Sequence, residues 1–376
     1  MKTVKLCDIC DVRDGTHDSP SYYLDGYPFI TTKNLVNGTI DFSTASLICE
    51  EDFRHFDKRS HVDDGDILMP MIGTIGGAII VNKDREFAIK NVALIKKDKE
   101  SIDFNFLLHV LNSKKMLTYF EQFKTGGTQK FISLNFIRNL PIPEKSLSEQ
   151  QKIAAHLDSI QSAIDNKKQQ FQQLDELVKS KFVEMFGDPI ANEMDWTKKI
   201  MTDVCPIKEY DFTPSENEWI LNLDMIESNT GTILEKVISP LGEIGNSTIK
   251  FSEKHVLYSK LRPYLNKVAL PDGYGFATSE FVPFFPGKEI NRIYFATFLR
   301  SAPFVELINS KSGGAKMPRA SMDFLRKFEI PVPPIELQNT FAEYVQKIDS
   351  SKSIIKTQLN DLNELLESKM DFYFGE

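Results

Sequence analysis

Apolar residues follow a 3.5-residue repeat along two long stretches of the chain. In the first stretch the repeat positions, which include two lysines, are Ile153, Leu157, Ile160, Ile164, Lys167, Phe171, Leu174, Val178, Lys181 and Met185. In the second stretch they are Phe341, Val345, Ile348, Lys352, Ile355, Leu359, Leu362, Leu366, Lys369 and Tyr373. A heptad repeat sustained over about five heptads predicts coiled-coil helices. The length and the strict register disfavour the alternative, an ordinary amphipathic core helix.

Helix start and stop signals flank both stretches. "IPEKSLSEQQ" before the first supplies a proline and Ser148 as an N-cap, and the prolines of "IPVPPIELQ" precede the second. Gly187 and Gly375 follow the last repeat positions and are typical C-terminal stops. Each helix should therefore contain about 38 residues and be roughly 55–60 Å long at the α-helical rise.

The rest of the chain mixes strand and helix patterns. "GDILMPMIGTIGGAIIV" (Gly65–Val81) has two β-rich runs around a glycine turn and predicts a hairpin, and "VLYSKLRPYLNKVAL" (Val256–Leu270) takes its place later in the chain. The same elements are predicted next in both halves of the chain. They are a strand (ending near Leu94 in the first half and near Phe285 in the second), a helix (over 104–120 and over 292–309), a loop with paired glycines and a short amphipathic segment. Because strands and helices mix without alternating, we predict α+β heads.

The second half of the chain repeats the first at an offset of 188 residues. The residues that meet an identical partner at this offset include Arg138, Ile142, Pro143, Gln150, Ala154, Ile160, Leu174, Glu176, Leu177, Lys181, Phe186 and Gly187. Weaker similarity continues upstream, where "FAIKNVAL" (Phe87–Leu94) meets "FATSEFVP" (Phe276–Pro283) at an offset of 189. A register held over this length indicates an internal duplication.

Each copy is thus a globular head followed by a long helix. The predicted divisions are a first head at 1–145, a first helical segment at 146–188, a second head at 189–333 and a second helical segment at 334–376. Two similar helices in one chain should pair with each other, and a pseudo-two-fold relation makes them antiparallel. The predicted fold is therefore a tandem duplication of an α+β head with a long helix, in which an antiparallel coiled coil keeps two heads at a fixed separation.

Composition limits the class of protein. A chain of 376 residues is too long for one ordinary core, and 41% apolar with 26% charged residues is typical of globular domains. No apolar run reaches the roughly 18 residues of a membrane span, and the first residues show no signal pattern. Four cysteines do not predict a disulfide framework, so the expected compartment is the cytoplasm.

The net charge of −8 first argues against nucleic acid, but its distribution changes that interpretation. The two helical segments hold −6 of this charge, and the two heads carry −1 each. Near-neutral heads leave room for a basic face on each. Asn246–Lys267 carries five Lys or Arg against one acid, with Tyr258 and Tyr264 between them. Such tips suit a polyanion and its base edges, although a solvated hairpin face is the alternative for any single residue.

The sequence contains no catalytic constellation. It has no Gly-x-x-x-x-Gly-Lys phosphate loop, no Gly-x-Gly-x-x-Gly after a strand, and no Asn-Pro-Pro-Phe-like or Asp-Pro-Pro-Tyr-like methyltransferase loop. The six histidines show no metal spacing, and the lone C-x-x-C of Cys7 and Cys10 lacks the second pair that a zinc site needs. His17, Asp18 and Ser19 are adjacent and cannot form the geometry of a triad.

Several stretches form a recognisable pattern through their order and duplication. In the first half they are "GTHDSP" (Gly15–Pro20), "YPFITTKNL" (Tyr27–Leu35), the 65–81 hairpin, "IPEKSLSEQQKIAAHLDSI" (Ile142–Ile160) and "FGDP" (Phe186–Pro189). In the second half they are "VLYSKLRPYLNKVAL" and "FATSEFVPF" (Phe276–Phe284). Together they resemble the DNA-specificity subunit of type I restriction–modification systems over the whole chain. "ELQNTFAEYV" (Glu336–Val345) departs from the pattern, because it lacks the Glu-Gln-x-x-Ile-Ala run of the first copy.

The resemblance implies a function and partners. Each head would be a target-recognition domain for one half of a bipartite, asymmetric double-stranded DNA site, and the helices would space the two domains. The subunit would be non-catalytic and would recruit two methyltransferase subunits that modify adenine N6, with restriction subunits as further partners. S-adenosylmethionine, ATP and Mg would bind those partners, so no cofactor or metal is expected in this chain. The departure in the second helical segment leaves its methyltransferase contact with less support than the first.

The loops that differ between the heads supply the candidate DNA contacts. In the first head these candidates are Thr16, His17, Lys33, Asn34, Thr74, Lys90, Asn91, Lys124, Thr128, Gln129 and Lys130. In the second head they are Lys260, Arg262, Tyr264, Asn266, Lys267, Ser279, Lys316 and Arg319. A two-headed scaffold that binds proteins, and a recognition subunit of a methylation-only system, are the alternative functions.

Overall fold

The computed structural model describes residues 2–73, 76–97, 101–124, 130–314 and 316–375. The chain forms two compact units, and each is built from a head and the adjoining parts of both long helices. Unit 1 consists of Met1–Lys168 with Thr357–Glu376, and unit 2 consists of Gln169–Lys356. None of the helices in the described part of the chain combines the length and the apolarity of a membrane span.

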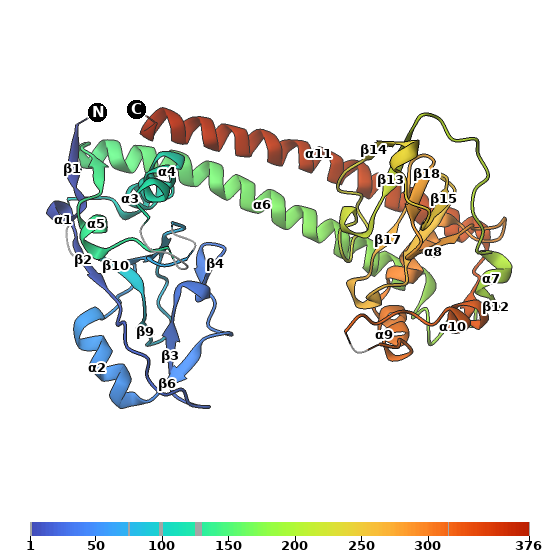
Figure 1. Ribbon diagram of the computed structural model, residues 1–376, viewed down its shortest axis with the longest axis horizontal. Coiled ribbons are helices and arrows are strands. Elements are labelled where there is room, and N and C mark those ends of the chain that lie inside the picture. The colour runs from blue at the N-terminus through green and yellow to red at the C-terminus, as the bar shows by residue number, and fades with distance from the viewer. Residues whose placement is uncertain (1, 74–75, 98–100, 125–129, 315, 376) are drawn as a thin grey trace. The chain divides into compact units, whose positions relative to one another are not determined.

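The two long helices lie where the heptad pattern places them. They are α6 (Leu147–Phe186) and α11 (Ile335–Phe374), each of 40 residues (Figure 1). Gly187 follows α6 with a φ of +75°, a left-handed conformation that favours glycine at a helix end. The predicted N-cap of the first helix is wrong by two residues. Ser146 forms the capping box with Glu149, because the Ser146 hydroxyl accepts from the Glu149 N–H at 3.4 Å and the Ser146 N–H donates to the Glu149 carboxylate at 3.0 Å.

Both helices pair in antiparallel fashion within each unit. In unit 1 the start of α6 meets the end of α11, where Phe374 shares a core with Ile153 and Leu157. In unit 2 the end of α6 meets the start of α11, where Phe182 and Phe186 pack edge-on against Phe341. These contacts confirm the predicted antiparallel coiled coil.

Unit 1 carries a mixed head with two main sheets. Its strands are β1 (Thr3–Lys5), β2 (Asp11–Asp14), β3 (Tyr27–Ile30), β4 (Leu35–Val36), β5 (Thr39–Ile40), β6 (Ser46–Ile48), β7 (Ile67–Pro70), β8 (Ile79–Ile80), β9 (Ala88–Ile89), β10 (Val92–Lys96) and β11 (Pro141–Pro143). Its helices are α1 (Leu6–Ile9), η1 (Thr32–Asn34), α2 (Glu50–Ser60), α3 (Phe104–Leu111), α4 (Lys114–Phe123) and α5 (Leu134–Arg138). The sheets have the orders β2-β10-β7-β8 and β6-β3-β9, and β1 pairs with β11.

Unit 2 repeats this plan. Its strands are β12 (Lys198–Ile200), β13 (Asn217–Leu221), β14 (Val237–Pro240), β15 (Thr248–Phe251), β16 (Val256–Ser259), β17 (Val268–Ala269), β18 (Gly275–Thr278), β19 (Phe281–Phe284) and β20 (Glu329–Pro331). Its helices are α7 (Met201–Val204), η2 (Leu223–Met225), η3 (Leu241–Glu243), η4 (Pro263–Leu265), α8 (Arg292–Arg300), α9 (Ala302–Ser310) and α10 (Met322–Lys327). The sheet orders are β17-β16-β19 and β14-β13-β18-β15, and β12 pairs with β20 as β1 pairs with β11.

Both predicted hairpins are confirmed. Strands β7 and β8 pair antiparallel with Leu68 opposite Ile79, and β16 and β17 pair antiparallel with Leu257 opposite Ala269. The next strand of each head, β10 or β19, then pairs with the first strand of the hairpin. The hairpins therefore project from equivalent places in the two heads.

The single helix predicted after these strands is wrong in both heads, because two helices are present. In unit 1, α3 ends before Ser113, and the Ser113 hydroxyl caps α4 by accepting from the Met116 N–H at 3.3 Å. In unit 2, Pro303 lies in the first turn of α9. A proline there has no N–H for a continuous helix and its ring would clash with the preceding turn, so α8 ends and α9 begins.

An identical glutamine ties each head to its long helix. Gln150 is 5% exposed, and its side chain accepts from the Asp103 N–H at 2.8 Å and donates to the Lys145 carbonyl. Gln338 is fully buried, and its side chain accepts from the Asn291 N–H at 2.8 Å and donates to the Glu289 and Pro333 carbonyls. Asp103 and Asn291 cap α3 and α8, so the repeat identity marks a junction between head and helix that both copies share.

Candidate nucleic-acid interface

In the first head, two of the candidate loops meet beside the end of β9. The Thr16 N–H donates to the Ile89 carbonyl at 3.0 Å, and the Asn91 N–H donates back to the Thr16 carbonyl at 3.2 Å. A Cβ on Gly15 would lie 2.3 Å from the Ile89 carbonyl oxygen, so this close approach requires glycine. The "GTHD" turn is thereby pressed against the β9–β10 turn.

His17 projects from this contact between two polar partners. Its Nδ1 lies 2.6 Å from Asn91 Oδ1, and its Nε2 lies 3.2 Å from the buried carboxylate of Asp14. Arg59 of α2 makes an ion pair with the other oxygen of Asp14. The His17 side chain is 62% exposed, so a ring fixed by its neighbours faces solvent.

A cavity of about 200 Å³ opens beside His17. Its polar side is formed by Asp14, His17 and Asn91, and its apolar side includes Ile72 and Phe131. The turn after β7 reaches it through a bridge between Ile72 and Phe131 and a hydrogen bond from the Gly73 N–H to the Lys130 carbonyl. The structure therefore brings together the candidates His17, Asn91 and Lys130, which come from three separate segments.

The second head gathers its candidates in the equivalent place. The Lys260 N–H donates to the Glu280 carbonyl at 3.0 Å, and the Arg262 N–H donates to the Pro318 carbonyl at 2.7 Å. Arg319 pairs with the Glu280 carboxylate, with Nη2 at 2.8 Å and Nε at 3.3 Å. We name this group of Lys260, Arg262, Glu280 and Arg319 the second-head cluster.

Other candidates of the second head surround this cluster. Ser279 precedes Glu280, and its hydroxyl lies 2.8 Å from that of Ser247. Lys316 is exposed on the loop that carries Arg319, and Tyr264 is 50% exposed at the hairpin turn. The candidates at 260–264, 279 and 316–319 thus form one surface although up to about 60 residues of sequence separate them.

Arg262 adopts a backbone conformation that is uncommon for an arginine. Its φ and ψ are +48° and +64°, in the left-handed region, and its Nε is buried without a hydrogen-bond partner in the described part of the chain. The matched residue of the first head is Gly73, with a φ of +79°. Glycine takes this conformation at no steric cost, whereas another residue pays roughly 1–2 kcal/mol. The fold at this turn therefore favours glycine, and the arginine points to a role for its side chain.

Some candidates turn out to have internal roles. Asn34 is 4% exposed, and its amide bonds Thr31, Thr44 and the Asp41 carbonyl, so it has no group left for DNA. Thr16 is 8% exposed and its hydroxyl accepts from the Asp18 N–H. Asn266 donates to the Arg300 carbonyl, and the Lys267 Nζ donates to the Leu223 carbonyl at 2.6 Å. We correct the expectation for Asn34, Thr16 and Asn266, because each is at least nine-tenths buried and their polar groups are withdrawn from the surface, including an Asn266 Oδ1 that has no hydrogen-bond partner among the described residues. Lys267 is half-buried and its Nζ keeps further protons, so its DNA contact stays a prediction.

Lys33 and Lys124 lie outside these two groups of loops, whereas Lys90 belongs to the β9–β10 turn of the first group and forms a bridge with Thr16. Lys33 is exposed on η1, the Lys90 Nζ donates to the Ser19 hydroxyl at 2.7 Å, and half-buried Lys124, which follows α4, pairs with Glu121 of that helix. Thr74, Thr128 and Gln129 lie outside the described residues.

Sequence reasoning missed Glu280, Asp14 and Phe131. A signal for Glu280 was present, because the 189-residue match between "FAIKNVAL" and "FATSEFVP" aligns it with Asn91. The strand pairings support that match. Asn91 comes just before Val92, which pairs with Pro70 at the end of β7, and Glu280 comes just before Phe281, which pairs with Ser259 at the end of β16. Phe131 and Arg319 form the second matched pair, because they bridge Ile72 and Leu261 respectively.

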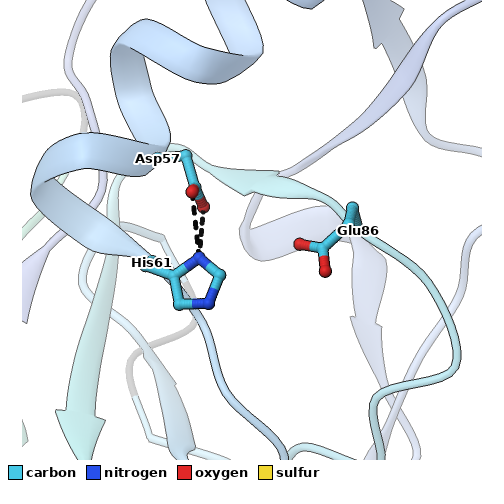
Figure 2. A group of neighbouring side chains, drawn as sticks. All are labelled: Asp57, His61 and Glu86. Carbon is cyan, nitrogen blue, oxygen red and sulfur yellow. Dashed lines mark hydrogen bonds and ion pairs between the residues drawn. The ribbon is translucent and has the colours of Figure 1, made fainter.

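One group of side chains has a geometry that suits a metal ion. Asp57, His61 and Glu86 bring their ligand atoms within 4.8 Å of one another, and Figure 2 shows His61 directed at Asp57. His61 Nδ1 lies 2.8 Å from Asp57, and its Nε2 lies 3.2 Å from Asp63. Glu86 is 2.8 Å from Lys83. Each member therefore has an ion-pair partner in the protein, and the group is explained as a surface ion-pair network without a metal.

The C-x-x-C cysteines do not face a common site. Cys7 is exposed, whereas Cys10 is 1% exposed and belongs to the main apolar core of unit 1. A buried cysteine in such a core behaves as a small apolar residue.

Two like scaffolds that present different polar loops define a protein with two recognition domains. The family model for the type I restriction modification DNA specificity domain matches residues 1–176 and again residues 193–364. The chain therefore belongs to this family and contains two such domains in tandem.

Individual relatives agree with this assignment. MjaX, an inferred type I restriction enzyme specificity subunit of Methanocaldococcus jannaschii, is 22% identical, and the match covers 97% of this chain and 92% of that protein. The EcoBI specificity subunit of Escherichia coli is 30% identical over 38% of this chain and 31% of its own length.

Solved structures share the fold. The type I restriction–modification S subunit from M. genitalium matches with a TM-score of 0.55 at 15% identity, over 98% of this chain and 94% of that one. A chain from a structure of a type I restriction–modification system, solved to describe its assembly and conformational transition, matches with a TM-score of 0.57 at 15% identity, over 99% and 97%.

Proposed function

We propose that each specificity domain reads one half of a bipartite, asymmetric DNA site. The two long helices set the gap between the half-sites and dock two adenine-N6 methyltransferase subunits. Restriction subunits join the same complex. The chain itself is non-catalytic and holds no cofactor, while S-adenosylmethionine, ATP and Mg bind to the partner subunits.

The observation that carries this proposal is the contrast between matched positions. The junctions at Gln150 and Gln338 keep the same residue and share two hydrogen bonds. At the loop surface, Asn91 and Phe131 of the first head stand where Glu280 and Arg319 stand in the second. A common scaffold with different side chains at equivalent surface positions is what two different half-sites require, because bases are distinguished by hydrogen-bond patterns and apolar groups in the grooves.

The duplication also has an energetic reason. One domain that reads a few base pairs discriminates modestly, because each mismatch costs about 1–3 kcal/mol. Two readers in one chain make the second engagement intramolecular, so their discrimination combines.

Binding of the purified protein, with the subunits that copurify with it, to duplex DNA tests this function. We expect an affinity that falls steeply as salt rises, because phosphate contacts release counterions. A protein-binding scaffold predicts no salt-sensitive DNA affinity, and that result would remove the proposal. Copurification of methyltransferase subunits without a restriction subunit would instead indicate a methylation-only system.

Arg262→Ala tests whether the heads read separately. We expect it to weaken or alter recognition of one half-site only, because Arg262 belongs to the second head. Equal losses at both half-sites, or no loss at either, would contradict a model of two independent readers. Lys33→Ala, an exposed change in the first head, is the matched control and should leave the second half-site unaffected.

A further inference from the structure

The second-head cluster contains an arginine whose direction is fixed by a carboxylate. Arg319 is bound side-on, since its Nε and Nη2 both donate to Glu280. The Arg319 side chain nevertheless remains 52% exposed, whereas that of Glu280 is 26% exposed. The acid therefore lies behind the guanidinium group and the guanidinium group faces outward.

This pairing leaves part of the guanidinium group available. A guanidinium group has five N–H donors in one plane. The two bonds to Glu280 are the side-chain hydrogen bonds of Arg319 in the described part of the chain, and they use one Nε proton and one Nη2 proton. The edge formed by Nη1 and the second Nη2 proton remains, and it is a two-donor fork of fixed direction.

Glu280 is itself held in place. Its carbonyl accepts from the Lys260 N–H, and the Lys260 carbonyl accepts from the Ala320 N–H at 2.8 Å, so the segments that carry Lys260, Glu280 and Arg319 are bonded side by side. The hydrogen bonds from Arg319 lower the pKa of the Glu280 carboxyl, which keeps it ionised at neutral pH. A charged acceptor on a rigid backbone reduces the side-chain entropy that Arg319 would lose on binding.

The chemistry of this fork selects a particular base. In the major groove, guanine presents N7 and O6 as adjacent acceptors, and an arginine fork bonds both at once. Adenine offers a donor in place of O6, and cytosine and thymine lack the paired acceptors. A phosphate also accepts a fork, but it carries no sequence information.

We propose that Arg319, positioned by Glu280, reads a guanine in the half-site of the second head. This inference rests on the proposed function of the chain as a reader of DNA. The matched positions of the first head, Phe131 and Asn91, offer no cation, so the same contact is absent there. Phe131 is 42% exposed and lines the cavity beside His17, which suits an apolar base edge rather than guanine acceptors.

Selection from a randomised duplex DNA library on the full-length protein, with its copurifying subunits, tests the assignment. Wild-type protein should select two separated half-sites. Arg319→Ala should lose one required G·C pair in one half-site, with discrimination at that pair falling about ten- to a hundred-fold, while the other required positions stay. Arg319→Lys should not restore the preference, because a lysine keeps the charge but lacks the fork.

Two further variants separate the positioning of Arg319 by Glu280 from a general effect of substitution on the structure of the second head. Glu280→Gln keeps the shape but removes the charge, so we expect a several-fold loss of discrimination at the same pair. Arg326→Ala is the matched control, since Arg326 is 59% exposed on α10 of the same unit and faces Asp323 at 3.8 Å. It should change no required base.

The outcomes distinguish the inference from the function. If wild-type protein selects no sequence, the proposed function fails. If wild-type protein selects half-sites and Arg319→Ala keeps every required base, the inference fails and the function stands. A uniform loss of affinity with unchanged base preference would mark a phosphate contact and would also overturn it.

Discussion

Gln150 and Gln338 share two hydrogen bonds, one from the N-cap N–H of α3 or α8 and one to the carbonyl five residues earlier, whereas Asn91 and Glu280, at equally matched positions, have different partners. The first pair joins head to helix, and any change there would leave buried N–H and C=O groups unpaired. The second pair lies on the loop surface, where the two heads carry different residues: Asn91 has a φ of +55°, in the left-handed region, and Glu280 is not among the residues with positive φ. The difference shows that duplication preserved the scaffold and left the recognition surface free to change.

The helix junctions offer the largest test of a shared scaffold. Phe341 is fully buried against Phe182 and Phe186 in unit 2, and Ile153 is the matched residue in unit 1. Phe341→Ala should lower the free energy of unfolding of unit 2 by about 3–5 kcal/mol, because a large cavity forms. Trp196 and Trp219 both belong to unit 2, so tryptophan fluorescence during urea unfolding reports this unit.

Ile153→Ala is the matched control for this prediction. It should destabilise unit 1 while leaving the tryptophan transition nearly unchanged, since neither tryptophan lies in that unit. A loss below about 1 kcal/mol for Phe341→Ala would mean that the helix ends do not share a core with the head.

The two glutamines provide a narrower test. Gln338→Ala and Gln150→Ala should each cost about 1–3 kcal/mol, because buried donors and acceptors lose their partners. The cost should be larger for Gln338, which is fully buried and makes three bonds. Hydrogen exchange at the start of α8 and of α3 would report the two losses separately. If one variant lowered the free energy of unfolding and the other raised it, or if exchange stayed unchanged in both helices, a common junction would be contradicted.

Exchange of surface chemistry tests the other half of the comparison. The double variant Asn91→Glu with Phe131→Arg places the pair of the second head at the matched positions of the first. We expect the first half-site to gain a requirement for guanine, with a preference of about 1–3 kcal/mol over other bases. Duplex selection measures this directly. A protein that folds, binds DNA and keeps its original first half-site would show that these positions do not specify bases.

The smallest predicted effect concerns pH. His255 is fully buried in unit 2, its Nδ1 accepts from the Ser252 N–H at 3.0 Å and its Nε2 lies 2.9 Å from the Lys208 carbonyl. In unit 1 the matched residue is Asp66, which accepts from the Asp63 N–H at 2.7 Å and binds Lys96. The same backbone bond is thus made by an imidazole in one head and a carboxylate in the other.

Burial lowers the pKa of His255, so the folded unit holds the ring neutral. The unfolded chain protonates it near the ordinary value of about 6.5. Stability is therefore present above that value and is lost as the pH falls below it, because the unfolded state binds the extra proton. The urea midpoint from tryptophan fluorescence should fall between pH 7.5 and pH 5.5. His255→Gln should remove this part of the pH dependence, and an unchanged slope in that variant would contradict the assignment.

Much of the fold follows from local patterns. The heptad repeat predicted both long helices, because few structures other than a coiled-coil helix bury an apolar stripe over so many turns. The glycine turn predicted the hairpin of the first head. The breaks between α3 and α4 and between α8 and α9 were missed, although Ser113 and Pro303 were visible, because the apolar pattern continues across them.

The candidate site was only partly predictable. Basic residues at hairpin tips could be found from composition, but the burial of a side chain could not, so Asn34 and Asn266 were selected alongside exposed residues. The pair of Glu280 and Arg319 spans 39 residues of sequence and depends on how three segments align. Such long-range contacts require the tertiary structure.

Mapping of N6-methyladenine in cells with and without this gene tests the central claim most directly. Two different readers in one chain predict that loss of the gene removes methylation at a single two-part motif with different halves and a constant gap. A lost motif that is continuous or palindromic, or a methylation pattern that does not change, would contradict the account.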